Sequence, residues 1–418
     1  MPATPEFDPK DLEALAAPIT LLDRSEKTLV AGNRIVYQPM EANDAGSDGG
    51  PTDLTFERYR ARATGRAGLD FVEALSVSAA GRARPQQLMI TEGTKKGIAE
   101  VVEAYRAIND ETPLIFQLTH SGRFAIDPVT PYPVEGKDVP LLDDAALARI
   151  GDDLVAATRI AFDVGADGID FKHCHGYLLG AMLGPANRAR PGWTYGGETL
   201  EERSRFTFET LARMMDAVPT DRFLYTVRLS AYEGIPGGFG SVGPDSAELD
   251  ESFAELIGFV TRLEAAGVSL INQSAGVPDL TPDLVRQTND APDGFFGHQR
   301  LAAAIKGAVK IPVIGSGYSY PKAGRNRLPG EPAEKNIVTL AGRAIREGMV
   351  DLIGVGRQCL ADPGFAAKLI EGRFDEILWD TTCNRCAVAL RSGIPAGCVT
   401  FDPAAKERYR EMRREVPS

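Results

Sequence analysis

The 418-residue sequence lacks several features that mark large functional classes. It contains no apolar run near the roughly 20 residues that a helix needs to cross a bilayer. Its opening stretch, Met1–Asp8, has neither the basic nor the apolar region of a secretory signal. Basic residues are in the minority, because 46 Lys and Arg stand against 58 Asp and Glu and give a net charge of −12. We therefore expect a cytoplasmic protein whose main partners are neither nucleic acids nor membranes.

Cysteine is scarce, and its placement is uneven. Five cysteines, an odd number in a chain of this length, do not suggest a disulfide framework. Cys383, Cys386 and Cys398 follow Asp380 in the pattern Asp-x2-Cys-x2-Cys-x11-Cys. Three thiolates and a carboxylate can hold an iron–sulfur cluster, and Cys-x2-Cys spacing is also common in zinc sites. The sequence leaves three interpretations open, namely a [4Fe–4S] cluster, zinc, or a metal-free remnant of such a site.

Short β-rich runs alternate with amphipathic segments along most of the chain. The predicted strands are Arg34–Met40, Leu69–Leu75, Pro113–Leu118, Gly168–His173, Phe223–Leu229, Val268–Gln273, Ile311–Gly315 and Asp351–Val355. The predicted helices include Lys96–Asn109, Ala145–Val164, Leu200–Ala217, Asp250–Ala266 and Glu334–Glu347. Eight such units favour a single α/β domain, a (β/α)8 TIM barrel, over an open doubly wound sheet. We place this barrel at residues 1–372 and a short Cys-containing extension at 373–418.

Polar residues recur where the predicted strands end. They are Glu41, Gln117, His120, Lys172, His175 and Arg228. Because the carboxyl ends of barrel strands meet on one face, we expect these residues to form one site. Two insertions, 121–142 and 318–332, leave the same face and are interpreted either as covers for a pocket or as solvated loops.

Several motifs resemble the Old Yellow Enzyme family of flavoproteins. They are Asn33-Arg34-Ile35-Val36-Tyr37-Gln38-Pro39-Met40, Gln117-Leu118-Thr119-His120-Ser121-Gly122-Arg123, His175-Gly176-Tyr177-Leu178-Leu179 and Asp351-Leu352-Ile353-Gly354-Val355-Gly356-Arg357. They occur in the family's order, each at its own predicted strand. The resemblance implies a single barrel that binds FMN and catalyses redox chemistry. No Gly-x-Gly-x-x-Gly dinucleotide fingerprint accompanies them, so we expect NAD(P)H to be a transient reductant rather than a resident cofactor.

The resemblance assigns roles to individual residues. Arg228 would place positive charge near the flavin N1–C2=O edge, and Gln117 would bond the same edge. Two glycine-containing turns at the last two strands would bind the phosphate. The implied cofactor residues are Pro39, Met40, Glu41, Ala74, Gln117, Arg228, Ser316, Gly317, Gly356 and Arg357. Lys172 and His175 would polarise a substrate carbonyl, and Tyr177 would deliver a proton to the α-carbon.

Two positions depart from the family's pattern. Lys172 stands where His or Asn is usual, and Glu41 stands where Thr or Cys is usual. A carboxylate close to the flavin would disfavour negative charge on the reduced ring unless it is paired, and Lys172 is a candidate partner. The tail motif is similar to that of trimethylamine dehydrogenase and 2,4-dienoyl-CoA reductase, with Asp380 in place of the first cysteine.

The leading hypothesis is NAD(P)H-dependent reduction of an activated C=C bond in an enone, enal or 2-enoate. One alternative is an oxidative amine or N-methyl dehydrogenase that passes electrons through a cluster to an external electron-transfer partner. A redox-neutral isomerase is a variant of the same site, and a non-catalytic flavin-binding partner subunit is an alternative of another class. Relatives often form dimers or tetramers, so the resemblance points to a homo-oligomer without fixing the number of copies.

Overall fold

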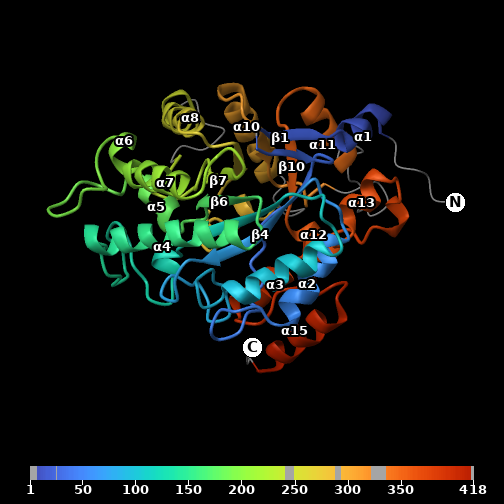
Figure 1. Cartoon of the computed structure of the whole chain (residues 1–418), viewed down its shortest axis with the longest axis horizontal. Coiled ribbons are helices and arrows are strands. Elements are labelled where there is room, and N and C mark those ends of the chain that lie inside the picture. The colour runs from blue at the N-terminus through green and yellow to red at the C-terminus, as the bar shows by residue number, and fades with distance from the viewer. Residues whose placement is uncertain (1–6, 25, 241–248, 288–292, 322–335, 416–418) are drawn as a thin grey trace.

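The chain folds around a closed parallel barrel. The structure, a computed structural model, describes residues 7–415 except residue 25 and residues 241–248, 288–292 and 322–335. The barrel strands, in chain order, are β3 (Ile35–Tyr37), β4 (Leu69–Ser76), β5 (Leu114–Thr119), β6 (Gly168–His173), β7 (Leu224–Ser230), β8 (Leu270–Ser274), β9 (Val313–Gly315) and β10 (Leu352–Val355). β10 pairs with β3 and closes the circle. Figure 1 shows the strands, among them β4, β6, β7 and β10, with helices around them. Each strand overlaps a predicted run, so the predicted (β/α)8 barrel is confirmed.

Helices surround the strands. The longer ones are α1 (Pro9–Ala16), α2 (Asp53–Ala63), α3 (Lys95–Arg106), α4 (Asp144–Asp163), α7 (Arg205–Ala217), α8 (Leu249–Ala265), α10 (Asp293–Ala308), α11 (Ile337–Arg346) and α15 (Pro403–Glu415). The shorter ones are α5 (Leu178–Leu183), α6 (Leu200–Arg203), α9 (Pro282–Val285), α12 (Arg357–Ala361), α13 (Phe365–Ile370) and α14 (Arg385–Arg391). The segment predicted as one helix over 200–217 is divided at Ser204 into α6 and α7. None of the helices in the described parts of the chain is long and apolar enough to cross a membrane.

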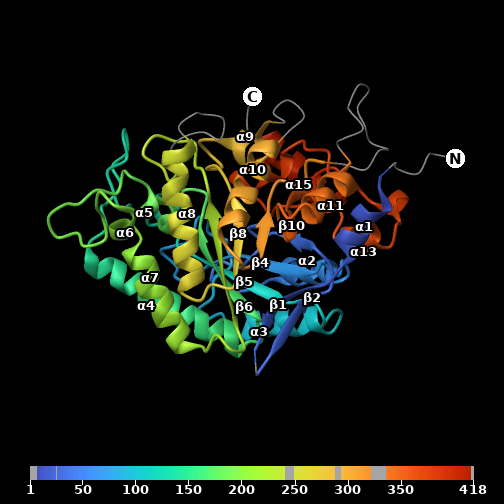
Figure 2. The same ribbon diagram turned by 90° about the horizontal axis from the view of Figure 1, so that it is seen from above.

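An antiparallel hairpin closes the amino end of the barrel, and the sequence analysis did not predict it. Its strands are β1 (Ile19–Asp23) and β2 (Thr28–Ala31). Apolar residues of the hairpin form one buried cluster with residues near the starts of the barrel strands. The cluster comprises Leu21, Leu22, Leu29, Ala31, Val36, Leu69, Phe71, Ile115, Leu224, Leu270, Ile314 and Leu352. Figure 2 shows the hairpin beside this end of the strands. The apolar hairpin removes water from this end of the barrel.

The C-terminal extension packs against the opposite end. The backbone N–H of Ala396 donates to the carbonyl of Ala42 at 2.7 Å. The Asn43 side-chain amide donates to the carbonyl of Gly393 at 2.8 Å. Both contacts join the tail to the loop that follows β3. Most of the second predicted insertion, residues 322–332, lies outside the described residues.

Candidate active site

A cavity of about 420 Å³ opens at the carboxyl ends of the barrel strands. The residues predicted to bind flavin or substrate lie in its wall, with one exception. They are Pro39, Met40, Glu41, Gln117, Lys172, His175, Tyr177, Arg228, Ser316, Gly317, Gly356 and Arg357. The exception is Ala74, which is fully buried within β4. His120 also lies away from the wall, and its Nδ1 accepts a hydrogen bond from the Gly122 N–H.

The strand ends supply a buried polar edge for a planar ring. The Arg228 side chain is 8% exposed, and its buried Nε has no hydrogen-bond partner among the described residues. The Gln117 amide nitrogen donates to Asp170 at 2.6 Å, which orients the amide group in the wall. A buried donor without an acceptor is costly, and an acceptor brought by a ligand would satisfy it. The carbonyl edge of a flavin offers such acceptors, so these residues fit FMN.

The predicted phosphate-binding residues stand at the ends of the neighbouring strands β9 and β10. Gly317 has a φ of 93°, a conformation that glycine adopts readily. A Cβ added to Gly356 would lie 2.8 Å from the Met40 sulfur, so a larger residue there would have to displace the Met40 side chain in the cavity wall. The Arg357 guanidinium donates to the carbonyl of Gln287 at 2.8 Å and to Asn384 at 2.6 Å. These contacts join the phosphate end of the cavity to the C-terminal tail.

Glu41 is held by cations and by the candidate proton donor. Its carboxylate accepts hydrogen bonds from Lys172 at 3.0 Å, Arg84 at 2.8 Å and the Tyr177 hydroxyl at 2.9 Å. Burial alone would favour the neutral carboxyl, but Lys172 and Arg84 outweigh it and lower the pKa of Glu41 to about 2. Burial and the Glu41 charge raise the pKa of Tyr177 well above 10, so the phenol keeps its proton. The predicted Glu41–Lys172 ion pair is therefore present, and the carboxylate is compensated.

His175 is fixed in a strained backbone conformation at the end of β6. Its φ is 64°, which is uncommon for a residue other than glycine. Its backbone N–H donates to Ser230 Oγ at 3.0 Å, and its Nε2 lies 2.9 Å from Ser274 Oγ. Burial, followed by the charges of Arg228 and Lys172, lowers the pKa of His175 well below 6.5. The imidazole therefore enters the reaction neutral and able to donate one hydrogen bond.

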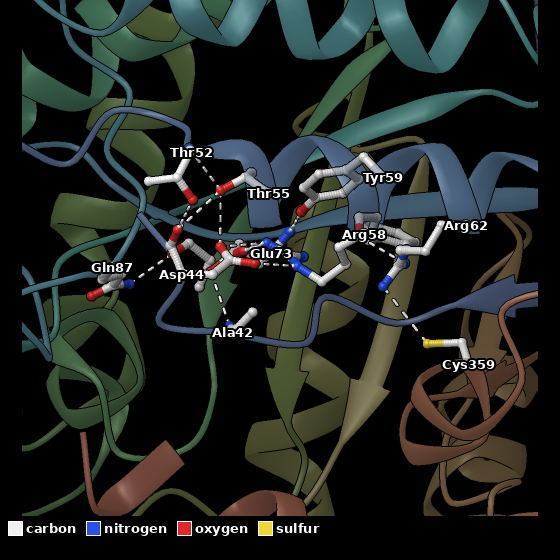
Figure 3. A network of polar contacts seen from close by, with 12 residues as sticks. Ala42, Asp44, Thr52, Thr55, Arg58, Tyr59, Arg62, Glu73, Gln87 and Cys359 are labelled. Atoms are coloured by element: carbon white, nitrogen blue, oxygen red, sulfur yellow. Dashed lines mark hydrogen bonds and ion pairs between the residues drawn. The ribbon is translucent and has the colours of Figure 1, made fainter. Parts of the chain in front are cut away.

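A buried charged network lies behind the segment that carries Glu41 (Figure 3). Arg58 of α2 pairs with Asp44 at 2.7 Å and with Glu73 of β4. The other oxygen of the Glu73 carboxylate accepts the backbone N–H of Ala42 at 3.2 Å. Paired buried charges of this kind fix geometry more reliably than they add stability. We infer that the network sets the path of the backbone at Glu41.

The tail cysteines lie close enough to interact electrostatically with one another and with Asp380. Cys383 is exposed, Cys386 is partly buried in the cavity wall, and Cys398 is buried. The described residues contain no group of three or more His, Cys, Asp or Glu side chains arranged to hold a metal ion. Burial, followed by the Asp380 charge, raises the pKa of the Cys386 thiol to about 12, so without a bound metal this thiol is protonated. Asp380 lies 3.6 Å from Arg357. The [4Fe–4S] cluster, zinc and a metal-free site therefore all stay predictions for this motif.

Other residues in the wall were missed by the sequence analysis. They include Gln38, Arg84, Ser274, Arg286, Gln287 and His298. Ser274 ends β8, so the pattern of polar strand ends could have identified it. Arg84 and Arg286 lie in loops, and no local pattern predicts that these loops turn toward the cavity.

The chain belongs to the NADH:flavin oxidoreductase / NADH oxidase family, whose model matches residues 15–376. The predicted resemblance to Old Yellow Enzymes is thereby confirmed, and with it the class of FMN-dependent oxidoreductases. The chain is 33% identical over 371 residues to an NADH oxidase of Thermoanaerobacter brockii, and the match covers 85% of this chain and 51% of that protein. The chain thus spans about half the length of this relative.

Solved structures share the fold. A 2-naphthoyl-CoA reductase complex with 2-naphthoyl-CoA aligns with a TM-score of 0.76 at 22% identity, covering 95% of this chain and 58% of that one. The Old Yellow Enzyme homologue from Zymomonas mobilis aligns with a TM-score of 0.63 at 22% identity, covering 85% and 92%. At these identities the likeness concerns the architecture alone.

Proposed function

We propose that this chain catalyses NAD(P)H-dependent reduction of a C=C bond conjugated to a carbonyl group. The observation that supports this proposal most directly is that Lys172, His175 and Tyr177 line one cavity. The Arg228 Nε, which has no hydrogen-bond partner among the described residues, belongs to a side chain of the same cavity wall. A related NADH oxidase and several related NADPH dehydrogenases support a nicotinamide nucleotide as the reductant. When bound, FMN supplies hydride transfer between the nicotinamide and the alkene.

The protein's own side chains would act on the substrate carbonyl and on the proton. The Lys172 ammonium and the neutral His175 imidazole would donate hydrogen bonds to the carbonyl oxygen, where negative charge develops. Tyr177 holds a proton throughout the neutral range and would give it to the α-carbon. The balance is one hydride to the β-carbon and one proton to the α-carbon, with NAD(P)H oxidised to NAD(P)⁺. Arg228 would stabilise negative charge at the flavin edge.

The compensated Glu41 argues against the alternative of a cationic amine as substrate. Its carboxylate already binds two cations, Lys172 and Arg84, within 3.0 Å. A substrate ammonium would have to displace one of them and would also face their positive charge. In addition, no group of three or more His, Cys, Asp or Glu side chains among the described residues could hold a metal ion, so nothing in the tail supports a route for electrons out of such a reaction.

An anaerobic absorbance titration tests the proposal. The purified protein should show flavin bands near about 450 and 370 nm that bleach with NADH or NADPH. Adding 2-cyclohexenone should restore the oxidised spectrum, whereas the saturated control cyclohexanone should not. In a Tyr177→Phe variant, bleaching should be unchanged and reoxidation should be slower. Flavin that is bleached by dimethylamine but not reoxidised by the enone would overturn the proposal in favour of amine oxidation.

A further inference from the structure

The cavity has a corner of positive charge that the proposed chemistry does not use. Arg286 and Arg391 both donate to the carbonyl oxygen of Pro278, at 2.8 and 2.5 Å. Two guanidinium groups that share one acceptor lie close enough to repel each other. All three residues line the cavity.

Only one of the two arginines has a carboxylate partner in the described parts of the chain. Arg391 pairs with Asp279 at 2.8 Å. Among the residues that the structure describes, no Asp or Glu side chain forms an ion pair with Arg286. Burial, followed by the charges of Arg391 and Arg357, lowers the pKa of Arg286 to about 10. The local charge of this corner is therefore positive, although the whole chain carries −12.

Of the other cations of the cavity, Arg228 is assigned to the flavin edge, and the rest are already engaged. Arg84 and Lys172 share Glu41, and Arg357 contacts Asp380, Asn384 and the carbonyl of Gln287. Arg286 directly precedes Gln287, whose backbone carbonyl accepts the hydrogen bond from Arg357. The Arg286 charge also acts on His175. It helps to lower the pKa of the imidazole, although burial and the charges of Arg228 and Lys172 contribute more. Arg286 thus lies within electrostatic range of both Arg357 at the phosphate end and His175.

We propose that Arg286, with Arg391 beside it, binds a carboxylate or phosphate group carried by a ligand that enters the cavity. This inference rests on the proposed function, because the ligand is either the substrate of the C=C reduction or the nicotinamide nucleotide. A guanidinium binds either anion through paired N–H donors, and a half-buried position strengthens the interaction. The substrate class that suits the corner is an activated alkene with a second, anionic group.

Calorimetric titration of the oxidised, FMN-loaded protein tests the proposal without turnover. Monomethyl fumarate and dimethyl fumarate share an ester-activated alkene and differ by one negative charge. Wild type should bind the monoester anion more tightly than the neutral diester. Arg286→Gln should weaken monoester binding roughly 10- to 100-fold and leave diester binding unchanged. Arg286→Lys should recover part of the loss, and Arg213→Gln, which breaks the exposed pair with Asp152, should have no effect.

A second arm separates the two sources of the anion. The anaerobic rate of bleaching by NADH and by NADPH is measured in wild type and in Arg286→Gln. A loss confined to this rate supports a nucleotide phosphate as the anion, and a loss confined to the monoester supports a substrate carboxylate. Unchanged behaviour in both arms would overturn the inference. Release of FMN from the variant would also overturn it, because the anion would then belong to the resident cofactor.

The outcomes also separate this inference from the proposed function. Arg286-dependent monoester binding without reoxidation of the bleached protein by any alkene would refute C=C reduction and keep the anion site. Reoxidation by both esters at equal rates, with no effect of Arg286→Gln, would support C=C reduction and refute the anion site.

Discussion

The two ends of the barrel are built from the same strands and have opposite characters. At the amino end, Leu69, Leu224, Leu270 and Leu352 begin their strands inside the apolar cluster that the β1–β2 hairpin closes. At the carboxyl end, charged and polar residues follow the same strands into the cavity. Burial of apolar side chains stabilises the fold. Clustered polar groups need hydrogen-bond or ion-pair partners, and strained backbone conformations gather at such sites. The comparison indicates that stability is concentrated at one end and chemistry at the other.

Acid should affect the cavity end first, and this is the largest expected effect. Three of the four histidines follow a strand end or line the cavity, and the fourth, His173, ends β6. Burial lowers the pKa of His120, His173 and His298 to about 4 and that of His175 well below 6.5. Their pKa in the unfolded chain is near about 6.5, so below that pH the unfolded state binds more protons and stability falls. At pH 5 the cost is on the order of 2 kcal/mol for each of the three histidines whose pKa is about 4.

Hydrogen exchange at pH 7 and pH 5.5, corrected for intrinsic rates, locates this effect. Protection should fall around the loops after β5 and β6 before it falls in β1 and β2. A uniform loss along the chain, or greater loss in the hairpin, would contradict the division between the two ends.

Phe71→Ala should show the reverse pattern at the amino end. Phe71 is fully buried in the hairpin-closed cluster, so its truncation should reduce the free energy of unfolding by about 3–5 kcal/mol. Turnover by the folded fraction should stay within about twofold of wild type, because the cavity is unchanged. Chemical denaturation and a steady-state assay measure the two quantities, and Ile108→Ala, at a side chain 44% exposed, is the matched control. A fall in turnover comparable with the fall in stability would show that the two ends are coupled.

The amino-acid pattern predicted the barrel and most of the cavity because both follow local rules. Strand runs such as Leu114–Thr119 begin with consecutive apolar residues, and the polar residues at and after the strand ends mark the catalytic face. The hairpin was missed because its short strands are recognised only through their packing on the barrel. Arg84 and Arg286 were missed because their place in the wall depends on the course of loops that no periodicity describes. The metal-like spacing of the tail cysteines did not predict how the side chains meet, since Asp380 turns to Arg357.

His175→Ala should separate chemistry from stability at the cavity end. Loss of one donor to the developing negative charge should slow alkene reduction about 10²–10³-fold. Stability should change by less than about 1 kcal/mol, because the His175 side chain is partly exposed and alanine leaves the backbone strain in place. His175→Asn is the control, since asparagine tolerates a φ of 64° and keeps a donor, and it should retain more of the rate. Stopped-flow reoxidation and thermal unfolding measure the two effects. Equal slowing in both variants would show that the imidazole itself, rather than a donor, is required.

Glu41→Gln should give the smallest effect and refine the comparison, because it tests whether an ion pair at the cavity end also contributes to folding. The pKa of Glu41 is lowered from 4.5 to about 2, so its ionised form adds stability above pH 4.5 that is lost as the pH falls toward 2. Glutamine keeps an acceptor for Tyr177 but leaves Lys172 and Arg84 without their counter-charge, so at pH 7 the variant should be less stable by about 1–2 kcal/mol. Denaturant unfolding at pH 7, 5 and 3.5 should show the gap between the two proteins narrowing as the pH falls. A gap that stays constant with pH would mean that the substitution acts through packing, and that the charges around Glu41 serve the chemistry alone.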